Sequence, residues 1–288
     1  MKRSHLVTPA EEGQRVDVLL RRHFGVSSGH LRRIKRLDDG ILCNGTRVFC
    51  DHKVRSGDRL ECHVADLGTS RLTPCPLPLD TVWEDDWLTV VNKPAGMPTH
   101  PSSFSPNEPS VAGCYLYAKG GTFHPVNRLD TGTSGLMVVA ANGYTHQLIT
   151  PQLHQGTLRR TYLALCVGYF TQKEGTVEAP IGRKPGSIVE RQVDPAGKPA
   201  LTHYRVLQEK NGLSLVELSP QTGRTHQLRV HMAYLGHPLL GDFLYGEDNQ
   251  TRPALHSYRL QMLHPVHKTP LELTAPLPQD MLKHVDLL

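Results

Sequence analysis

The sequence predicts an α+β protein, with a larger domain built on a mixed, largely antiparallel β-sheet with flanking helices and a small N-terminal α/β module. Three observations support this. In the later part of the chain, short apolar runs typical of strands are joined by loops or single helices rather than by regular crossover helices. The first 64 residues instead show helical spacing followed by an Asn-Gly turn. A Pro-containing stretch separates the two patterns.

The positive charge of the chain lies at its N-terminal end. Residues 1–64 carry 13 basic and 8 acidic side chains, which accounts for the whole net charge of +5, and the rest of the chain holds 19 of each. A separate basic module is typical of proteins that bind an anionic partner. No apolar run approaches the roughly 20 residues of a membrane helix, and the N-terminus lacks the apolar core of a signal peptide. We therefore expect a soluble, cytoplasmic protein.

The sequence holds no recognisable signature of a cofactor or a metal. The GxGxxG, GxxxxGK[ST], GxSxG and HExxH motifs are missing from it. Its six cysteines form no CxxC pair, so we expect reduced thiols rather than a zinc site or a disulfide framework. The predicted chemistry is therefore chemistry that side chains alone perform, with no cofactor and no metal.

The N-terminal module is predicted to begin with two helices. Apolar residues recur at helical spacing over residues 14–24, and Gly25 ends that helix. Ser27 or Ser28 is predicted to cap a second helix that runs to Gly40. Its apolar stripe leaves four cations projecting together toward solvent: Arg32, Arg33, Lys35 and Arg36. Next, Asn44-Gly45 predicts a tight hairpin, and a further strand closes the module.

The larger domain is predicted to follow an extended linker over residues 65–80. Its strands are predicted at WLTVVN, GLMVVAA, RTYLALCVG, LSLVELS and LELTA, and its helices lie near residues 108–119, 142–155 and 225–235. Pro151 is expected to kink the second of these helices. We find no internal repeat.

Three segments join strand ends to turns, where catalytic residues are commonly carried. The first, HPVNRLDTGTSGL, contains Arg128 and Asp130. The second, RRTYLAL, places Tyr162 in an apolar strand. The third, SPQTGRTHQLRVHMAYLGHPLLGD, contains Arg224 and Arg229. Taken singly, an Arg-x-Asp is more often a surface ion pair and a Tyr in an apolar strand is more often part of the core.

Together, the order and spacing of these segments resemble the RluA-type pseudouridine synthases. That family's first motif is essentially HRLDxxTSGL, and this chain reads NRLDTGTSGL. A basic residue, any residue and then Tyr-Leu-Ala form the second motif, here at residues 160–164. The third, TGRTHQLRVHM…LGHP…GD, stands at 222–242. VVNKPAGMPTHPS and ALHSYRL match the entry strand and a late strand, so the resemblance covers nearly the whole chain.

The resemblance implies a role for each matching residue. Asp130 is expected to be the catalytic carboxylate, with Arg229 as its ion-pair partner. Arg128 is expected to displace the target uridine and take its place in the RNA, and Tyr162 to stack on the flipped base. Arg224 is expected to support the site or the RNA backbone. An isomerisation that detaches uracil at ring nitrogen 1 and rejoins it at ring carbon 5 needs no redox cofactor.

The N-terminal module resembles the alpha-L RNA-binding module of the ribosomal-protein-S-four type. That resemblance implies RNA contacts at Arg32, Arg33, Lys35, Arg36 and Arg47. Cations of this kind contact phosphates, which supply affinity with little sequence information. We therefore divide the chain into an RNA-binding module at 1–64, a linker at 65–80 and a pseudouridine synthase catalytic domain at 81–288.

The expected partner is structured RNA, with large-subunit ribosomal RNA favoured by the appended module and transfer RNA left open. The alternatives are a non-catalytic RNA-binding or assembly protein that reuses the fold, and a metal-dependent hydrolase that uses the many His. The chain departs from the family pattern at Asn127, which replaces the usual His, and at Arg160, which replaces the usual Lys. A monomer is expected, and the sequence names no uridine position.

Overall fold

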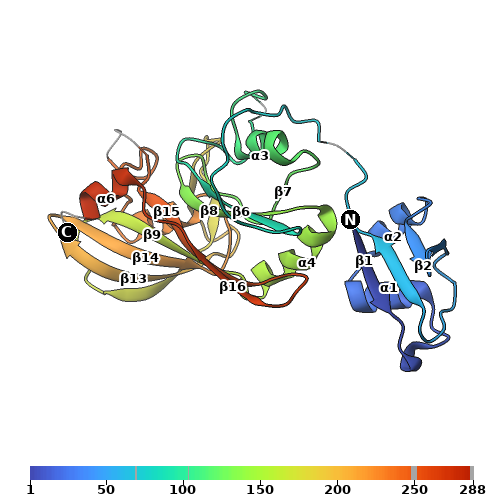
Figure 1. Cartoon of the computed structure of the whole chain (residues 1–288). Coiled ribbons are helices and arrows are strands. Elements are labelled where there is room, and N and C mark those ends of the chain that lie inside the picture. Colours follow the sequence, from blue (N-terminus) through green and yellow to red (C-terminus); the bar gives the residue numbers. More distant parts are fainter. Residues whose placement is uncertain (69, 103, 248–251, 286–288) are drawn as a thin grey trace.

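The structure is a computed structural model that describes residues 1–68, 70–102, 104–247 and 252–285. A small N-terminal sheet with its helices lies beside a much larger, curved sheet, as Figure 1 shows. Of the helices in these ranges, none combines the length and the apolar character needed to cross a membrane.

The N-terminal unit is a four-stranded antiparallel sheet covered by two helices. The strand order is β1-β4-β2-β3. Its elements are β1 (Lys2–Leu6), η1 (Pro9–Glu11), α1 (Val16–Phe24), α2 (Ser28–Ile34), β2 (Ile41–Cys43), β3 (Thr46–Arg47) and β4 (Arg59–His63). Asn44 and Gly45 both have positive φ, 52° and 78°, as the predicted two-residue hairpin requires. The first strand, β1, had no counterpart in the sequence prediction.

The basic helix α2 is amphipathic, as predicted. The Ser27 Oγ accepts a hydrogen bond from the His30 backbone N–H at 3.2 Å, which begins the helix. Leu31 and Ile34 are buried in the core of the unit, while Arg32 and Arg33 are exposed on the opposite side. The regular helix ends at Ile34, shorter than predicted, and Lys35 and Arg36 lie in the turn that follows.

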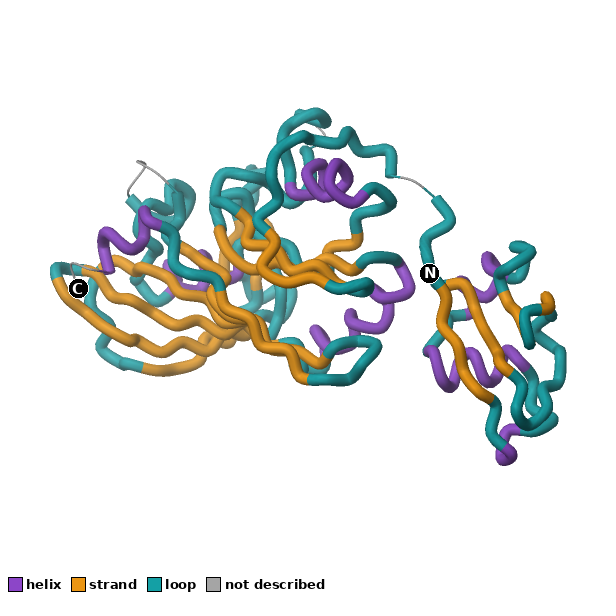
Figure 2. Tube along the Cα trace, in the orientation of Figure 1, coloured by secondary structure: helices purple, strands orange, loops and turns teal. Residues whose placement is uncertain are grey.

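The larger sheet has ten strands in the described residues and is antiparallel except where β8 runs parallel to β15. The strand order is β10-β13-β14-β9-β15-β8-β6-β5, with β16 added to β15 and β7 to β8. These strands are β5 (Thr81–Glu84), β6 (Leu88–Lys93), β7 (His124–Pro125), β8 (Ser134–Ala140), β9 (Arg159–Val167), β10 (Glu174–Glu178), β13 (Leu201–Lys210), β14 (Leu213–Pro220), β15 (Leu255–Leu263) and β16 (Pro270–Thr274). Figure 2 shows them as one long twisted band.

Helices and a small hairpin flank this sheet, so the predicted fold class is confirmed. They are α3 (Val111–Lys119), α4 (Gly143–His154), α5 (Gln227–Tyr234), α6 (Gln279–Val285) and the two-stranded β11 (Ile181–Arg183) and β12 (Arg191–Val193). Helix α4 runs through Pro151 to His154. Strand β8 is buried on both faces, with Val138 in the core layer shared with the N-terminal unit and Val139 in the opposite layer.

The N-terminal unit packs against the larger sheet through α4. The Tyr144 hydroxyl donates a hydrogen bond to the Phe24 carbonyl at 2.7 Å, and the Gln147 side-chain amide donates to the Gly25 carbonyl at 2.9 Å. Residues of both units form one continuous apolar cluster. Figure 1 shows α4 on the side of the sheet that faces the N-terminal unit.

The segment between the two sheets lies along α3. The Cys75 backbone N–H donates to the Gly113 carbonyl at 2.9 Å, and Leu72 and Leu79 pack against the core of the larger domain. At its start, Asp66 accepts hydrogen bonds from His124 and from the Gly143 backbone N–H. The part of the chain expected as an extended linker is therefore extended but held against the larger domain by these contacts.

Candidate active site

A tight loop between β7 and β8 carries Arg128 and Asp130. The Thr133 backbone N–H donates to the Asp130 carbonyl at 3.0 Å, which bends the chain directly after the carboxylate. Gly135 follows with φ 105°, and a Cβ there would lie 2.3 Å from the Ser257 carbonyl oxygen, so only glycine fits. This close approach is where β8 pairs in parallel with β15.

Asn127, which departs from the family pattern, has a structural role in the loop. It is buried, and its Oδ1 accepts a hydrogen bond from the Val138 backbone N–H at 2.8 Å. Its Nδ2 points to the Leu136 carbonyl at 3.5 Å. Asn127 therefore provides hydrogen-bond partners for backbone groups of β8 next to the loop. An uncharged amide can fill this role.

Two side chains, one at the end of β6 and one in the segment that follows, hydrogen-bond to carbonyl groups of this loop. The Thr99 hydroxyl donates to the Leu129 carbonyl at 2.8 Å. Lys93, only 1% exposed, donates through Nζ to the carbonyls of Pro94, Met97 and Thr131 at 2.8, 2.7 and 3.1 Å. Burial lowers the pKa of Lys93 to about 7, while the charge of Asp130 opposes that decrease. Sequence reasoning missed Lys93, although its position in VVNKP, at the end of a buried strand, was a signal.

Arg128 and Asp130 do not pair with each other. Arg128 is exposed and Asp130 is half-buried. Within the described residues, no ion pair within 4.0 Å joins the two side chains. The loop therefore presents a cation to solvent and a carboxylate toward the interior, one residue apart.

The carboxylate of Asp130 lies near Tyr162, Lys93 and His226, whose pKa values its charge influences. Tyr162 stands in β9 and is 6% exposed, within the core cluster. Burial raises the pKa of Tyr162, opposed by the charge of Arg160 and by a hydrogen bond with Ser257. The predicted carboxylate and the predicted stacking ring are thus brought together from segments more than 30 residues apart in the chain.

Arg229 has a different partner from the one predicted. Its Nε and Nη2 donate to the two carboxylate oxygens of Asp242 at 2.7 and 2.6 Å, and Asp242 is fully buried. The expected Arg229–Asp130 ion pair is absent from the part of the chain that the structure describes, so that prediction is wrong for this structure. The reason is geometric: Asp242 lies in the loop between α5 and β15, where its two oxygens meet the guanidinium in a bidentate arrangement.

Aromatic rings and His226 surround this buried pair. The Arg229 guanidinium lies over the rings of Tyr245 and Phe243, 5.0 and 5.8 Å from their centroids. The Tyr245 hydroxyl bonds His226 Nδ1 at 2.8 Å. His226 has φ 57°, an unusual conformation for a residue other than glycine, and burial lowers its pKa. After burial, which has the largest effect, the charges of Asp130, Arg229 and Asp242 all act on the pKa of His226.

The other predicted RNA-contacting side chains lie at the surface or on its border. Arg224 is half-buried, and its Nε donates to the Pro199 carbonyl at 2.9 Å. In the N-terminal unit, Arg32, Arg33, Lys35 and Arg36 are exposed. Arg47 donates to the Asp38 carboxylate at 2.7 Å and to the Lys35 carbonyl at 3.1 Å, which ties the hairpin to the end of the basic helix.

Tyr162 offers a test of the site that separates the ring from the hydroxyl. The resemblance noted in the sequence implies that Tyr162 stacks on a flipped base. Because such stacking contributes roughly 1–3 kcal/mol, we expect Tyr162→Leu to slow the reaction that the resemblance implies about 5- to 150-fold. Tyr162→Phe keeps the ring and is expected to stay within about threefold of the wild type. Single-turnover rates measure both, with thermal unfolding to confirm that each variant is folded. Equal losses in the two variants would exclude stacking as the function of the ring.

Comparisons with known proteins agree on one family. A family profile described as RNA pseudouridylate synthase matches residues 88–234. A Bacillus subtilis protein named uncharacterized RNA pseudouridine synthase YjbO is 41% identical over 268 residues, covering 90% of this chain and 94% of that protein. The Escherichia coli K12 protein named ribosomal large subunit pseudouridine synthase D is 34% identical and covers 98% of this chain and 93% of its own length.

Solved structures agree as well. The structure described as human RNA pseudouridylate synthase domain containing 1 has a TM-score of 0.59 at 27% identity, covering 73% of this chain and 94% of that chain. A second structure, described as human RNA pseudouridylate synthase domain containing 4, has a TM-score of 0.60 at 25% identity. It covers 72% of this chain and 92% of that chain.

Proposed function

The chain belongs to the RNA pseudouridylate synthase family, and we propose that it converts uridines of large-subunit ribosomal RNA to pseudouridine with Asp130 as the catalytic carboxylate. RNA pseudouridine synthase activity follows from the family. The observation that supports the role of Asp130 is its placement: a half-buried carboxylate on a loop held by Lys93 and Thr99, beside Tyr162.

The reaction exchanges one bond for another within the same nucleotide. The bond between the ribose and ring nitrogen 1 of uracil breaks, the ring turns, and ring carbon 5 bonds to the ribose. Carbon 5 then loses its proton and nitrogen 1 gains one, so the composition of the nucleotide is unchanged. An ionised carboxylate can start this exchange as a nucleophile or as a base.

The target base must leave its stack before Asp130 can reach it. Unstacking costs a few kcal/mol, and stacking on an aromatic ring contributes roughly 1–3 kcal/mol in return. We assign this stacking to Tyr162. We assign the displacement of the uridine to Arg128, which is exposed on the loop that also carries Asp130. Arg224 is assigned to the RNA backbone near the start of α5.

The N-terminal unit supplies the RNA affinity in this proposal, as an RNA-binding module over residues 1–64 joined through 65–80 to the catalytic domain at 81–288. Its four exposed cations suit phosphate contacts. Ribosomal RNA is favoured because the relative that spans nearly the whole chain is named a ribosomal large subunit enzyme. We propose a cytoplasmic location and a monomeric state for the protein.

Mapping of pseudouridines tests the proposal directly. Purified protein is incubated with large-subunit ribosomal RNA and with transfer RNA, both from cells that lack the protein, and modified sites are mapped. We expect new pseudouridines in the ribosomal RNA. Sites in transfer RNA alone would exclude the ribosomal substrate, and no modification of either RNA would favour the non-catalytic alternative.

The basic helix has its own test, because removing the whole N-terminal unit would expose the apolar surface around Tyr144. Arg32→Ala combined with Arg33→Ala is expected to weaken RNA binding. The slope of log affinity against log salt should decrease by about 1.5, since each lost phosphate contact contributes roughly 0.7–0.9. Filter binding at salt concentrations from about 50 to about 300 mM measures the slope.

The same unit provides a matched control in Arg21→Ala with Arg22→Ala. These two residues are also adjacent, exposed arginines on a helix, here α1. The control pair should keep the wild-type slope. If both pairs change the slope equally, the RNA does not bind α2 specifically.

A further inference from the structure

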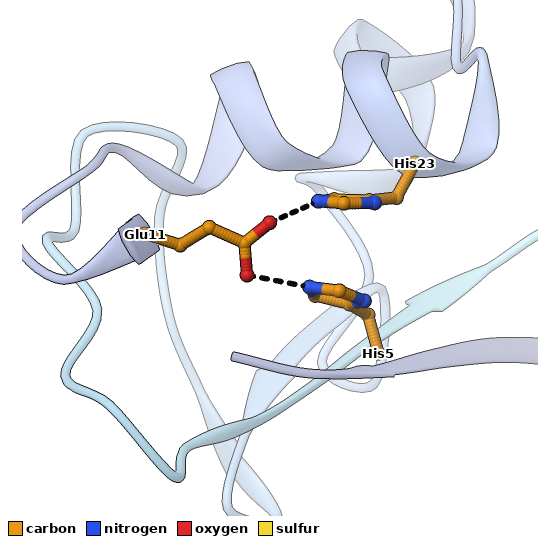
Figure 3. Close-up of side chains that lie close together, drawn as sticks. All are labelled: His5, Glu11 and His23. Carbon is orange, nitrogen blue, oxygen red and sulfur yellow. Dashed lines mark hydrogen bonds and ion pairs between the residues drawn. The ribbon is translucent and has the colours of Figure 1, made fainter. Parts of the chain in front are cut away.

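His5, Glu11 and His23 converge on one point of the N-terminal unit, away from the active-site loop (Figure 3). They come from three elements: β1, η1 and the last turn of α1. One ligand atom of each residue lies within 4.8 Å of the others. His5 Nε2 lies 2.9 Å from one carboxylate oxygen of Glu11, and His23 Nε2 is hydrogen-bonded to the other oxygen.

Thr8 holds the carboxylate of Glu11 in position independently of the two histidines. Glu11 is 6% exposed, and its Oε2 accepts hydrogen bonds from the backbone N–H and the hydroxyl of Thr8, both at 2.9 Å. The site therefore has an oxygen ligand in a set position, supported by outer hydrogen bonds of the kind that orient metal ligands.

The two imidazole rings are stacked, with centroids 3.7 Å apart and planes at 19°. In Figure 3 both rings point their Nε2 atoms toward the same carboxylate. A ring nitrogen that hydrogen-bonds a carboxylate carries the proton, so a metal can replace the two hydrogen bonds to Glu11 only when each ring carries its proton on Nδ1 instead. In that tautomer the two Nε2 atoms and the carboxylate offer two nitrogen ligands and one oxygen ligand. Neutral imidazole nitrogen and carboxylate oxygen are a ligand set that zinc accepts.

We propose that His5, Glu11 and His23 form a binding site for a zinc ion in the N-terminal unit. Bonds of about 2.0–2.2 Å in a tetrahedral site place neighbouring ligand atoms roughly 3.3 Å apart, and the ligand atoms of these three side chains already lie within 4.8 Å of one another. The histidine side chains are 19% and 28% exposed, so an ion can enter and a water can complete the coordination. The proposal is independent of the proposed reaction at Asp130.

The bound ion would join the first strand to the first helix of this unit. Since such a site does not exist in the unfolded chain, binding stabilises the folded state. We expect zinc in about 100-fold excess over its dissociation constant to raise the midpoint of thermal unfolding by about 5 °C. A chelator should reverse this rise.

The experiment uses the full-length protein and zinc chloride, without RNA. Isothermal titration is expected to detect one zinc ion per chain, and cobalt in the same site should show the intense visible absorption of tetrahedral coordination. His23→Gln keeps a hydrogen-bonding side chain at an exposed position and should weaken zinc binding at least about tenfold. Its unfolding midpoint without zinc should equal that of the wild type within about 2 °C.

A second cluster, Asp85, His264 and His267, provides the matched control. There the Nδ1 atom of His264 already accepts hydrogen bonds from two backbone N–H groups, at 3.2 and 2.9 Å. Those two bonds to Nδ1 keep the ring proton on Nε2, the nitrogen that faces Asp85, so His264 offers no lone pair to a metal there. His267→Gln should therefore leave zinc binding unchanged. The proposal would be overturned if the wild-type protein bound no zinc. It would also be overturned if His267→Gln removed zinc binding and His23→Gln did not.

Discussion

Asp130→Asn is expected to reduce pseudouridine formation by at least about 10³-fold while RNA affinity remains within about threefold of the wild type. The amide has nearly the same size but cannot act as the ionised group that starts the exchange. No side-chain hydrogen bond of Asp130 is seen among the residues described, so the substitution breaks no visible contact. Single-turnover modification of ribosomal RNA measures the rate, and filter binding measures the affinity.

Asp86→Asn is the control for this prediction, because it makes the same chemical change at an exposed aspartate. It should modify RNA at the wild-type rate. A fully active Asp130→Asn variant would show that another group performs the chemistry. A variant that loses activity and RNA binding together would instead indicate that Asp130 has a structural function.

Asp242→Asn is expected to lower the free energy of unfolding by about 3–5 kcal/mol. The substitution leaves the Arg229 guanidinium, which is 4% exposed, without its buried counter-charge. It also weakens the acceptor for the backbone N–H groups of Leu244 and Tyr245. Urea unfolding of wild type and variant measures the difference, with Asp86→Asn again as the surface control.

A double variant separates the effect of the unpaired charge on the free energy of unfolding from the effect of lost packing. Replacing both partners, by Arg229→Met and Asp242→Leu, removes the unpaired charge and should destabilise the protein less than Asp242→Asn alone. If the single variant is within about 1 kcal/mol of the wild type, the ion pair does not hold this part of the site.

The pairing of Arg229 illustrates why the site could be predicted only in part. Asp130, Tyr162 and Arg229 were identified by their motifs, and the structure brings Asp130 and Tyr162 together. The partner of Arg229 was assigned by resemblance to Asp130, yet a second buried carboxylate lies 13 residues away along the chain. Which of two carboxylates meets a guanidinium depends on the direction of the side chains after α5 has packed, and spacing along the sequence does not encode that direction.

Lys93 and His226 were missed for a related reason. A lysine after an apolar strand normally reaches solvent. Here three backbone carbonyls from two loops enclose its Nζ, and those loops meet only in the folded chain. The conformation of His226, with φ 57°, likewise depends on the turn between β14 and α5 and on the Tyr245 hydroxyl.

The family motifs, the α+β class, the basic helix and five strands of the larger sheet could be predicted from the sequence alone, because periodicity, capping and turn residues act locally. The tertiary structure decided the partner of Arg229, the burial of Lys93, the structural role of Asn127 and the convergence of His5, Glu11 and His23. These four features depend on side chains from separate elements meeting at distances of a few ångströms. Such distances are set by how helices and strands pack, which no local pattern in the chain specifies.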